Sequence, residues 1–376
     1  EPYSSPANLW LYWGSTTNRR MTGSGEKIRH IFKMGTIQGG EWRDPKFLRK
    51  ITGPLFRALS EKCCVSLLFP PFEWDFPIYN PSKAIAQRMR SFVANGNEIK
   101  VIYADSPEEI DYTEHGINRC IVIDNTGVWR DKAGLSRHLQ AKGVAKVILT
   151  APGKGDIKNI VAGINDSEIA DDDTILSAAS CTTNAIVPVL KAADDEYGIS
   201  AGHVETVHAY TNDQNLIDNY HKSERRGRSA ALNMVLTETG AAKAVAKVLP
   251  QLEGKLSGNA IRVPTPNVSM AILNLTLNGP TTRDELNEFM RETALHSRMK
   301  KQIDYSNSPE VVSSDFVGSR AACVFDAKAT IVNGNQAVLY LWYDNEYGYS
   351  CQVYRVLEQM GGIRYQTYPA KGPYPL

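Results

Sequence analysis

The sequence lacks an excess of charge of either sign and lacks long apolar runs. Its 42 lysines and arginines are balanced by 41 aspartates and glutamates, which argues against a polyanionic partner or a membrane surface. No apolar run approaches the roughly 18 to 20 residues that cross a bilayer. The first residues also lack the basic-then-apolar layout of a signal peptide. We therefore expect a cytoplasmic protein that binds neither nucleic acid nor membranes.

Cysteine is scarce and is not arranged in metal-binding pairs. Six cysteines in 376 residues do not make a disulfide framework, and no two Cys-x-x-Cys elements are present to hold zinc. The cysteines are Cys63, Cys64, Cys120, Cys181, Cys323 and Cys351. We expect free thiols and no metal site.

The pattern of the chain changes near Val93. Residues 1–92 hold four of the six tryptophans and eight of the nineteen prolines, and they show no clean periodicity. After Asn95-Gly96, a hairpin turn signal, apolar runs predict strands, and a helix is predicted over about 132–142. Strand, helix and strand with short connections are typical of a parallel α/β unit. The predicted strands are 99–103, 120–124, 145–151, 160–165 and 174–179.

The strand predicted over 174–179 leads directly to Cys181. A helical pattern follows at once and ends at Gly198, so the thiol is expected at a helix N-terminus. From these residues alone two interpretations stay open. Cys181 is either a small buried hydrophobe or a nucleophile whose thiolate is favoured by the unpaired N–H groups and the helix dipole.

The second half of the chain predicts an α+β domain. An alternating run over 203–210 presents His208 near its end, and a polar excursion over 211–229 carries Arg225, Arg226 and Arg228, which are the kind of charges found in a solvated loop. Thr239 and Gly240 open a short helix, where they either cap it or offer N–H groups to an anion. Thr282 caps a helix predicted from Arg283 to about Arg298. Strands are predicted at 268–277, 321–325, 329–332 and 337–343.

Five motifs in order identify a family resemblance that covers about residues 93–360. They are SCTTN at 180–184, VHAYTNDQ at 207–214, TGAAKAV at 239–245, RVPTPNV at 262–268 and WYDNEYGYS at 342–350. Together they resemble the phosphorylating glyceraldehyde-3-phosphate dehydrogenases, and they look nearest to a longer bacterial branch of that family. The first 92 residues do not match the family pattern.

The resemblance implies an NAD- or NADP-dependent oxidation of glyceraldehyde 3-phosphate to 1,3-bisphosphoglycerate. Cys181 would form the thioester, and His208 would act as its base. The remaining implied site residues are Thr211 and Arg262 for the substrate phosphate; Ser180, Thr182, Thr239 and Gly240 for inorganic phosphate; and Thr126, Gly127, Asn345 and Tyr349 for the cofactor. The alternatives are an erythrose-4-phosphate dehydrogenase, or a non-catalytic member that acts as an interaction or regulatory protein.

The implied fold is α/β, with a Rossmann-like dinucleotide-binding domain and an α+β catalytic domain whose sheet is mostly antiparallel. The first domain would take residues 1–180, with an atypical segment at 1–92, and would be completed by a helix within 345–376. The catalytic domain would take 181–344. The loop over 211–228 looks like the family's S-shaped loop at a subunit interface, which implies a homotetramer.

The family's opening Gly-x-Gly-x-x-Gly is not found in residues 1–92. The nearest pattern, Gly23-Ser24-Gly25, lacks the third glycine and a preceding buried strand. Because the change near Val93 is abrupt, we hypothesise that the upstream segment is a misread or frame-shifted version of the family's N-terminal half. Reading the gene in all three frames tests this hypothesis.

Overall fold

The computed structural model describes residues 9–12, 66–68, 91–94 and 97–363, which fall into two compact units. In the described residues, the first unit takes 97–158, 171–177 and the short segments before them, and the second unit takes 159–170 and 178–363. No helix in these ranges combines the length and the apolar character needed to cross a membrane. The Gly23-Ser24-Gly25 pattern lies outside the described residues.

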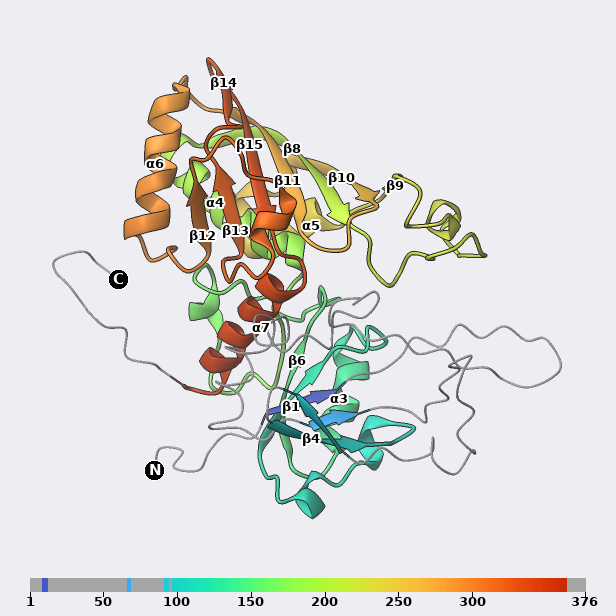
Figure 1. The fold of residues 1–376 in the computed structure, drawn as a ribbon. Coiled ribbons are helices and arrows are strands. Elements are labelled where there is room, and N and C mark those ends of the chain that lie inside the picture. The colour runs from blue at the N-terminus through green and yellow to red at the C-terminus, as the bar shows by residue number, and fades with distance from the viewer. Residues whose placement is uncertain (1–8, 13–65, 69–90, 95–96, 364–376) are drawn as a thin grey trace. The chain divides into compact units, whose positions relative to one another are not determined.

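The first unit is built on a seven-stranded sheet (Figure 1). Its order is β3 (Ser91–Ala94), β4 (Asn97–Ile102), β2 (Ser66–Leu68), β1 (Leu9–Tyr12), β5 (Cys120–Asp124), β6 (Val144–Leu149) and β7 (Ile175–Ser177). All neighbouring strands are parallel except β3 and β4. Numbered along the chain without β3, the parallel strands lie in the order 3-2-1-4-5-6, which is the order of a doubly wound sheet.

The sequence predicted part of this unit correctly. The antiparallel pairing of β3 with β4 confirms the hairpin, and the helix expected near 132–142 is α3 (Lys132–Gln140). β5 is buried at every position, as expected of a strand covered on both faces. Strands β1 and β2 lie in the segment to which the sequence analysis assigned none.

The strand predicted over 160–165 was wrong, because 160–161 have no regular structure and 162–165 form turns, all in the second unit. The side chain of Asn165 occupies the backbone groups that a strand would need. Its Oδ1 accepts from the N–H of Val161 at 2.8 Å, and its Nδ2 donates to the carbonyl of Asn159 at 3.0 Å. The apolar run instead buries Ile160 and Val161 completely.

The second unit has an eight-stranded, mostly antiparallel sheet, as predicted. The strands run in the order β12 (Ile303–Ser306), β13 (Cys323–Asp326), β15 (Gln336–Tyr343), β11 (Ser269–Leu277), β8 (Ile199–Ala209), β10 (Leu256–Val263) and β9 (Val235–Thr237), with β14 (Ile331–Asn333) beside β15. The pairs β12–β13 and β8–β10 are parallel, and the others are antiparallel. The sequence pattern did not predict β9, β10 or β12.

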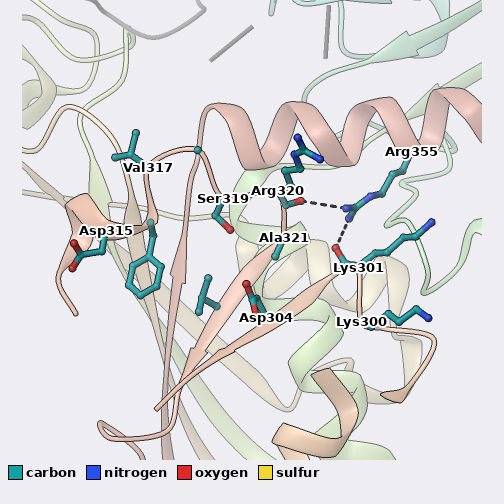
Figure 2. A pocket seen from close by; sticks show the side chains of 12 residues that line it. Lys300, Lys301, Asp304, Asp315, Val317, Ser319, Arg320, Ala321 and Arg355 are labelled. Carbon is teal, nitrogen blue, oxygen red and sulfur yellow. Dashed lines mark hydrogen bonds between the residues drawn. The ribbon is translucent and has the colours of Figure 1, made fainter. Parts of the chain in front are cut away.

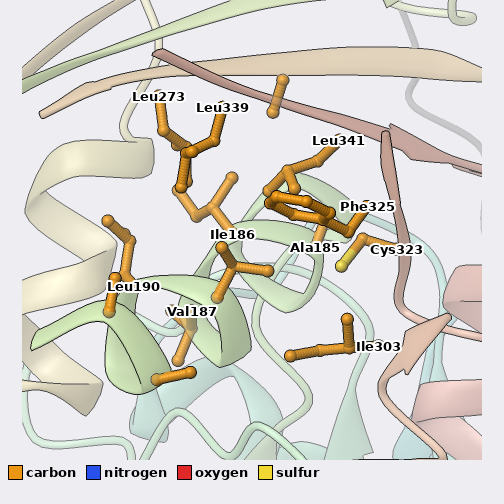
Figure 3. Close-up of a cluster of buried hydrophobic side chains, with 14 of the residues drawn as sticks. Ala185, Ile186, Val187, Leu190, Leu273, Ile303, Cys323, Phe325, Leu339 and Leu341 are labelled. Carbon is orange, nitrogen blue, oxygen red and sulfur yellow. The ribbon is translucent and has the colours of Figure 1, made fainter. Parts of the chain in front are cut away.

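Helices pack on one face of this second sheet (Figures 1 and 3). α4 (Cys181–Tyr197) lays Ile186 and Leu190 against Leu273 of β11 and Leu339 of β15 in a single buried cluster. Apolar side chains of α5 (Ala241–Val248) and α6 (Arg283–His296) join the same cluster. Because α4 is the central helix of this core, its N-terminus is held in a fixed place at one end of the sheet.

The C-terminal helix α7 (Tyr347–Met360) contacts α4 within the second unit. The sequence analysis assigned residues 345–376 to the first domain, and the structure groups 178–363 with the catalytic sheet instead. The part that this segment plays in the dinucleotide-binding domain stays a prediction.

Candidate active site

Cys181 is the first residue of α4, as the sequence predicted. The turn before it is tightly fixed. Ala179 has a positive φ of 56°, which is costly for a residue with a side chain. The Ser180 Oγ accepts from the N–H of Thr183 at 3.1 Å and so caps the helix. The amide of Asn184 donates to the carbonyls of Ala178 and Ser180. These contacts present the Cys181 thiol at a helix N-terminus that cannot easily shift.

His208 faces this thiol from the end of β8. Its Nε2 lies 3.5 Å from the Cys181 Sγ, although 27 residues separate the two along the chain. The imidazole is buried, with 5% of His208 exposed, whereas Cys181 is half-buried and therefore open on one side. A thiol at a helix N-terminus beside an imidazole is the arrangement that favours a reactive thiolate.

The second ring nitrogen of His208 has two neighbours. Its Nδ1 lies 2.7 Å from the carbonyl of Ala209 and 2.6 Å from the Arg262 Nη1. Nδ1 can donate to the carbonyl only while it is protonated, and it can accept from the guanidinium only while it is not. The two contacts therefore suit the two neutral tautomers, and the ring can keep its place while its proton sits on either nitrogen.

Tyr343, at the end of β15, supports the pair from inside the core. Its hydroxyl contacts the Oγ1 of Thr182 at 3.0 Å and that of Thr206 at 2.7 Å. Its ring stands edge-on to His208, with 5.9 Å between the centroids. Burial raises the pKa of Tyr343, so the hydroxyl stays protonated and neutral. The sequence analysis did not assign a role to Tyr343, although it lies within the WYDNEYGYS motif.

A cluster of cationic and hydroxyl groups adjoins the pair. Asp213 contacts three members of this cluster. Its Oδ1 accepts from the Thr211 hydroxyl and lies 3.7 Å from the Arg262 Nη2. Its Oδ2 accepts from the Arg226 Nη1 at 2.7 Å. Arg226 also donates to the Thr237 Oγ1 from two nitrogens. Thr211 and Arg262 thus lie together, as predicted residues of one phosphate site would.

The sequence predicts a solvated loop for Arg226 and its neighbours, and the structure corrects this prediction for Arg226. Arg226 is half-buried and turned toward Asp213 and Thr237, whereas Arg225 and Arg228 are exposed. Sequence spacing gave no signal that separates the three arginines, because only the folded loop decides which side chain turns inward.

The other predicted phosphate residues lie on two helix starts. Ser180 and Thr182 stand on either side of Cys181, but the Thr182 hydroxyl is buried and contacts Tyr343. Thr239 accepts from the N–H of Ala241, and Gly240 is the residue before α5, which packs on α4. In this structure the hydroxyls of Ser180, Thr182 and Thr239 accept from or contact neighbouring groups of the protein, and the part of all four residues in phosphate binding stays a prediction.

The predicted cofactor residues are divided between the units. In the first unit, Thr126 and Gly127 form the turn after β5, where the Asp124 carboxylate accepts from the N–H of Thr126 at 2.6 Å and Gly127 has a φ of 69°. In the second unit, the Ser269 hydroxyl donates to the Asn345 Oδ1 at 2.8 Å, and the Tyr349 hydroxyl donates to the carbonyl of Ala179. Tyr349 therefore braces the turn that carries Cys181.

Comparisons with known proteins agree with this geometry. The profile of the glyceraldehyde 3-phosphate dehydrogenase C-terminal domain matches residues 180–345. The chain is 64% identical over 285 residues to a glyceraldehyde-3-phosphate dehydrogenase-like protein of Pseudomonas aeruginosa (strain UCBPP-PA14), which takes in 76% of this chain and 62% of that protein. The chain thus spans less than two thirds of that relative.

Two further relatives are covered more fully. The chain is 38% identical over 347 residues to a glyceraldehyde-3-phosphate dehydrogenase of Borreliella burgdorferi, with 90% of this chain and 98% of that protein covered. It is 44% identical over 265 residues to glyceraldehyde-3-phosphate dehydrogenase 2 of Bacillus subtilis, with 70% and 76% covered. Because residues 93–376 alone are too few for the Borreliella match, that match extends into the N-terminal segment.

Proposed function

Because this chain belongs to the glyceraldehyde-3-phosphate dehydrogenase family, we propose that it oxidises and phosphorylates glyceraldehyde 3-phosphate to 1,3-bisphosphoglycerate. The observation that carries the proposal is the 3.5 Å contact between the Cys181 Sγ and the His208 Nε2 at the N-terminus of α4. The adjoining Arg262 supports an aldehyde substrate that carries an anionic group.

The chemistry follows from the positions of these groups. The His208 Nε2 takes the proton of the Cys181 thiol, the thiolate adds to the aldehyde carbon, and the carbonyl oxygen takes that proton from the imidazolium to become a hydroxyl. The His208 Nε2 takes the hydroxyl proton while hydride leaves the same carbon, which gives a thioester. Inorganic phosphate then attacks the thioester carbon, the carbon–sulfur bond breaks, and the acyl phosphate leaves with the thiolate restored.

Two anion positions are needed for this sequence. Thr211 and Arg262 are proposed to hold the phosphate of the substrate, since a guanidinium binds phosphate oxygens in pairs. Asp213 orients both side chains through the contacts described above. The attacking phosphate is proposed to be held by Ser180, Thr182, Thr239 and Gly240. These residues would bind it in addition to the contacts that they make at the helix starts.

The hydride acceptor is proposed to be NAD or NADP, which supplies an oxidised nicotinamide ring. Three features of the chain fit a dinucleotide. The first unit has the strand order of a doubly wound sheet, and Gly127 supplies the left-handed turn after β5 that a bulkier residue would resist. In the second unit, Ser269 fixes the amide of Asn345, which suits binding of a carboxamide.

A further proposal is that the protein acts as a homotetramer. Support comes from the loop and short strand over 216–236, where apolar side chains are unusually exposed. Leu232 and Met234 are 81% and 75% exposed, and Ile217 and Tyr220 are also exposed. Exposed apolar patches on a folded unit mark surfaces that associate with another protein, and a second copy fits the family resemblance.

The proposed activity is tested by mixing the full chain with glyceraldehyde 3-phosphate, phosphate and NAD or NADP, and following the absorbance of the reduced cofactor. We expect turnover that requires both phosphate and aldehyde and that is lost in Cys181→Ser. Saturable cofactor binding without turnover would contradict the proposal, and the absence of binding at millimolar cofactor would favour a non-catalytic family member. Erythrose 4-phosphate, assayed in parallel without phosphate, tests the paralogous activity.

A further inference from the structure

A cavity of about 630 Å³ lies in the second unit and shares no residue with the candidate active site (Figure 2). Its walls come from the connection between α6 and β12, from β12 and β13, from residues 315–321, which begin inside the short helix Ser313–Phe316, and from α7. A cavity of this size matches the pockets that hold small metabolites.

One wall of this cavity carries four cationic side chains, and Arg355 of α7 holds that wall together. The Arg355 guanidinium donates to the carbonyls of Lys301 and Arg320 (Figure 2). It also donates to the Gln352 Oε1. All three acceptors are neutral, so these bonds position the guanidinium without cancelling its charge. Burial lowers the pKa of Arg355, which shows that its positive charge is held at a cost.

The other three cations are Lys300, Lys301 and Arg320, and all are exposed. Within the described part of the chain, no carboxylate lies within 4.0 Å of these three or of Arg355. Other cations of the second unit do form ion pairs with carboxylates: Lys191 pairs with Asp195, and Arg291 pairs with Glu288. Glu358 of α7 attracts Lys301 and Arg355 from a longer distance, but the cavity lining itself holds four cations against two carboxylates. An excess of cations on a concave surface concentrates anions there.

The cavity is not uniformly positive, because Asp304 and Asp315 also line it. The Asp315 Oδ2 accepts from the N–H of Val312 at 2.8 Å. One oxygen of Asp304 accepts from the N–H of Tyr305, and no described side chain is hydrogen-bonded to its other oxygen. A ligand that fits both ends therefore needs an anionic group for the cations and hydroxyl donors for Asp304.

We propose that this cavity binds a phosphorylated, hydroxyl-bearing metabolite, such as a sugar phosphate or a nucleotide. The phosphoryl oxygens accept from Lys300, Lys301 and Arg320, and hydroxyl groups of the ligand donate to Asp304. Arg355 is a positioning residue, since its donors are used in holding the two backbone segments. The site stands apart from Cys181 and does not depend on the proposed dehydrogenase activity.

The test is calorimetric titration of the full chain with glucose 6-phosphate and, separately, with ADP, which distinguishes the two sources of the phosphate group. We expect one of these probes to bind, and we expect its affinity to fall about tenfold or more in Lys300→Gln/Lys301→Gln and in Arg320→Gln, because each loses charged hydrogen bonds. Asp304→Asn should weaken the same probe, and inorganic pyrophosphate should bind without sensitivity to Asp304→Asn.

Two controls keep the result interpretable. Arg283→Gln/Lys328→Gln removes two charges from the same unit outside the cavity, and Arg262→Gln removes a cation of the candidate active site; neither should change the affinity that depends on Lys300 and Lys301. The proposal is overturned if the cavity variants, with unchanged thermal melting, bind both probes as tightly as the original chain. It is also overturned if all phosphate-dependent binding disappears in Arg262→Gln. The Arg320→Gln variant, at an exposed position, provides the answer if the double variant does not fold.

Discussion

The described cysteines show how the surroundings of one side chain decide its chemistry. Cys120, Cys323 and Cys351 are buried, and burial raises the pKa of each thiol, that of Cys120 to about 12. Cys181 is half-buried, begins a helix and contacts an imidazole. All four residues are cysteines, so the differences in their reactivity come from burial and from neighbouring groups alone.

We expect iodoacetamide to label Cys181 at neutral pH well before the three buried cysteines. A raised pKa means that the neutral thiol persists as pH rises, so Cys120 becomes a thiolate only as the pH approaches 12. Peptide mass spectrometry after brief labelling at pH 7 and pH 9 measures the order. Labelling of Cys120 or Cys323 at pH 7, at the rate of Cys181, would contradict this explanation.

His208 is expected to control that reactivity. In His208→Asn the imidazole base is lost, so we expect turnover to fall about 10²- to 10⁴-fold and the labelling of Cys181 to slow. His203 provides a matched control on the same strand. It contacts Ser257 and Asn259 rather than the thiol, and His203→Asn should leave both rates near those of the original chain. Equal losses in the two variants would show that the fold of β8, and not the base, had been disturbed.

At the scale of single elements, the two ends of α4 are capped in different ways. Its start depends on the side chain of Ser180, and its end depends on the backbone freedom of Gly198, whose φ is 67°. A Cβ added at Gly198 would lie 2.1 Å from the Asn278 Nδ2. The residue that ends the helix therefore has no room for a side chain, because Asn278, at the start of the loop after β11, fills that space.

Gly198→Ala should lower the free energy of unfolding by about 1 to 3 kcal/mol, from left-handed backbone strain together with displacement of Asn278. Gly254→Ala has the strain alone, since its φ is 76° and nothing lies within 4 Å of the new Cβ. Gly279→Ala has neither feature. Urea denaturation should therefore rank Gly198→Ala as the most destabilised and Gly279→Ala as the least. A different order would show that the contact with Asn278 does not matter.

At the scale of the whole molecule, the second unit leaves apolar surface uncovered. Alternate side chains of β8, β11 and β15 face the buried cluster, while those between them are mostly only partly buried. Apolar side chains are also exposed over 216–236. A surface of this kind is costly in water, which is the physical basis for proposing self-association.

The double variant Leu232→Glu/Met234→Glu is expected to weaken the proposed tetramer, because two charges would be buried without partners at the interface. Sedimentation velocity or light scattering would then show smaller species than the original chain. Val312→Glu/Ile331→Glu is the control, since these residues are also about half-exposed, at 54% each, but lie outside 216–236. Identical assembly of all three proteins would contradict an interface over 216–236.

The sequence by itself determined the elements whose signals are local. The apolar helical pattern after Cys181 and the glycine at its end, Gly198, predicted α4, and the alternation over 203–210 predicted that a strand would end near His208. The same residues sufficed to identify the family. In each case the information lies in neighbouring residues, because caps, turns and periodicity act within a few positions.

Only the tertiary structure decided which residues meet. β10 was missed because Ser257, Gly258 and Asn259 interrupt its pattern, and it is a strand because it pairs with β8 over eight residues. Arg226 and Arg225 are the same amino acid, and only the fold of the loop turns Arg226 inward. Residues 160–165 do not form a strand, because the Asn165 side chain takes backbone hydrogen bonds that a strand would need. The sequence predicted Cys181 at the start of a helix. Its contact with His208, and the contacts of that ring with Arg262 and Tyr343, form only because strands from distant parts of the chain come together. Such contacts have no local signal, because packing and pairing of separate elements create them.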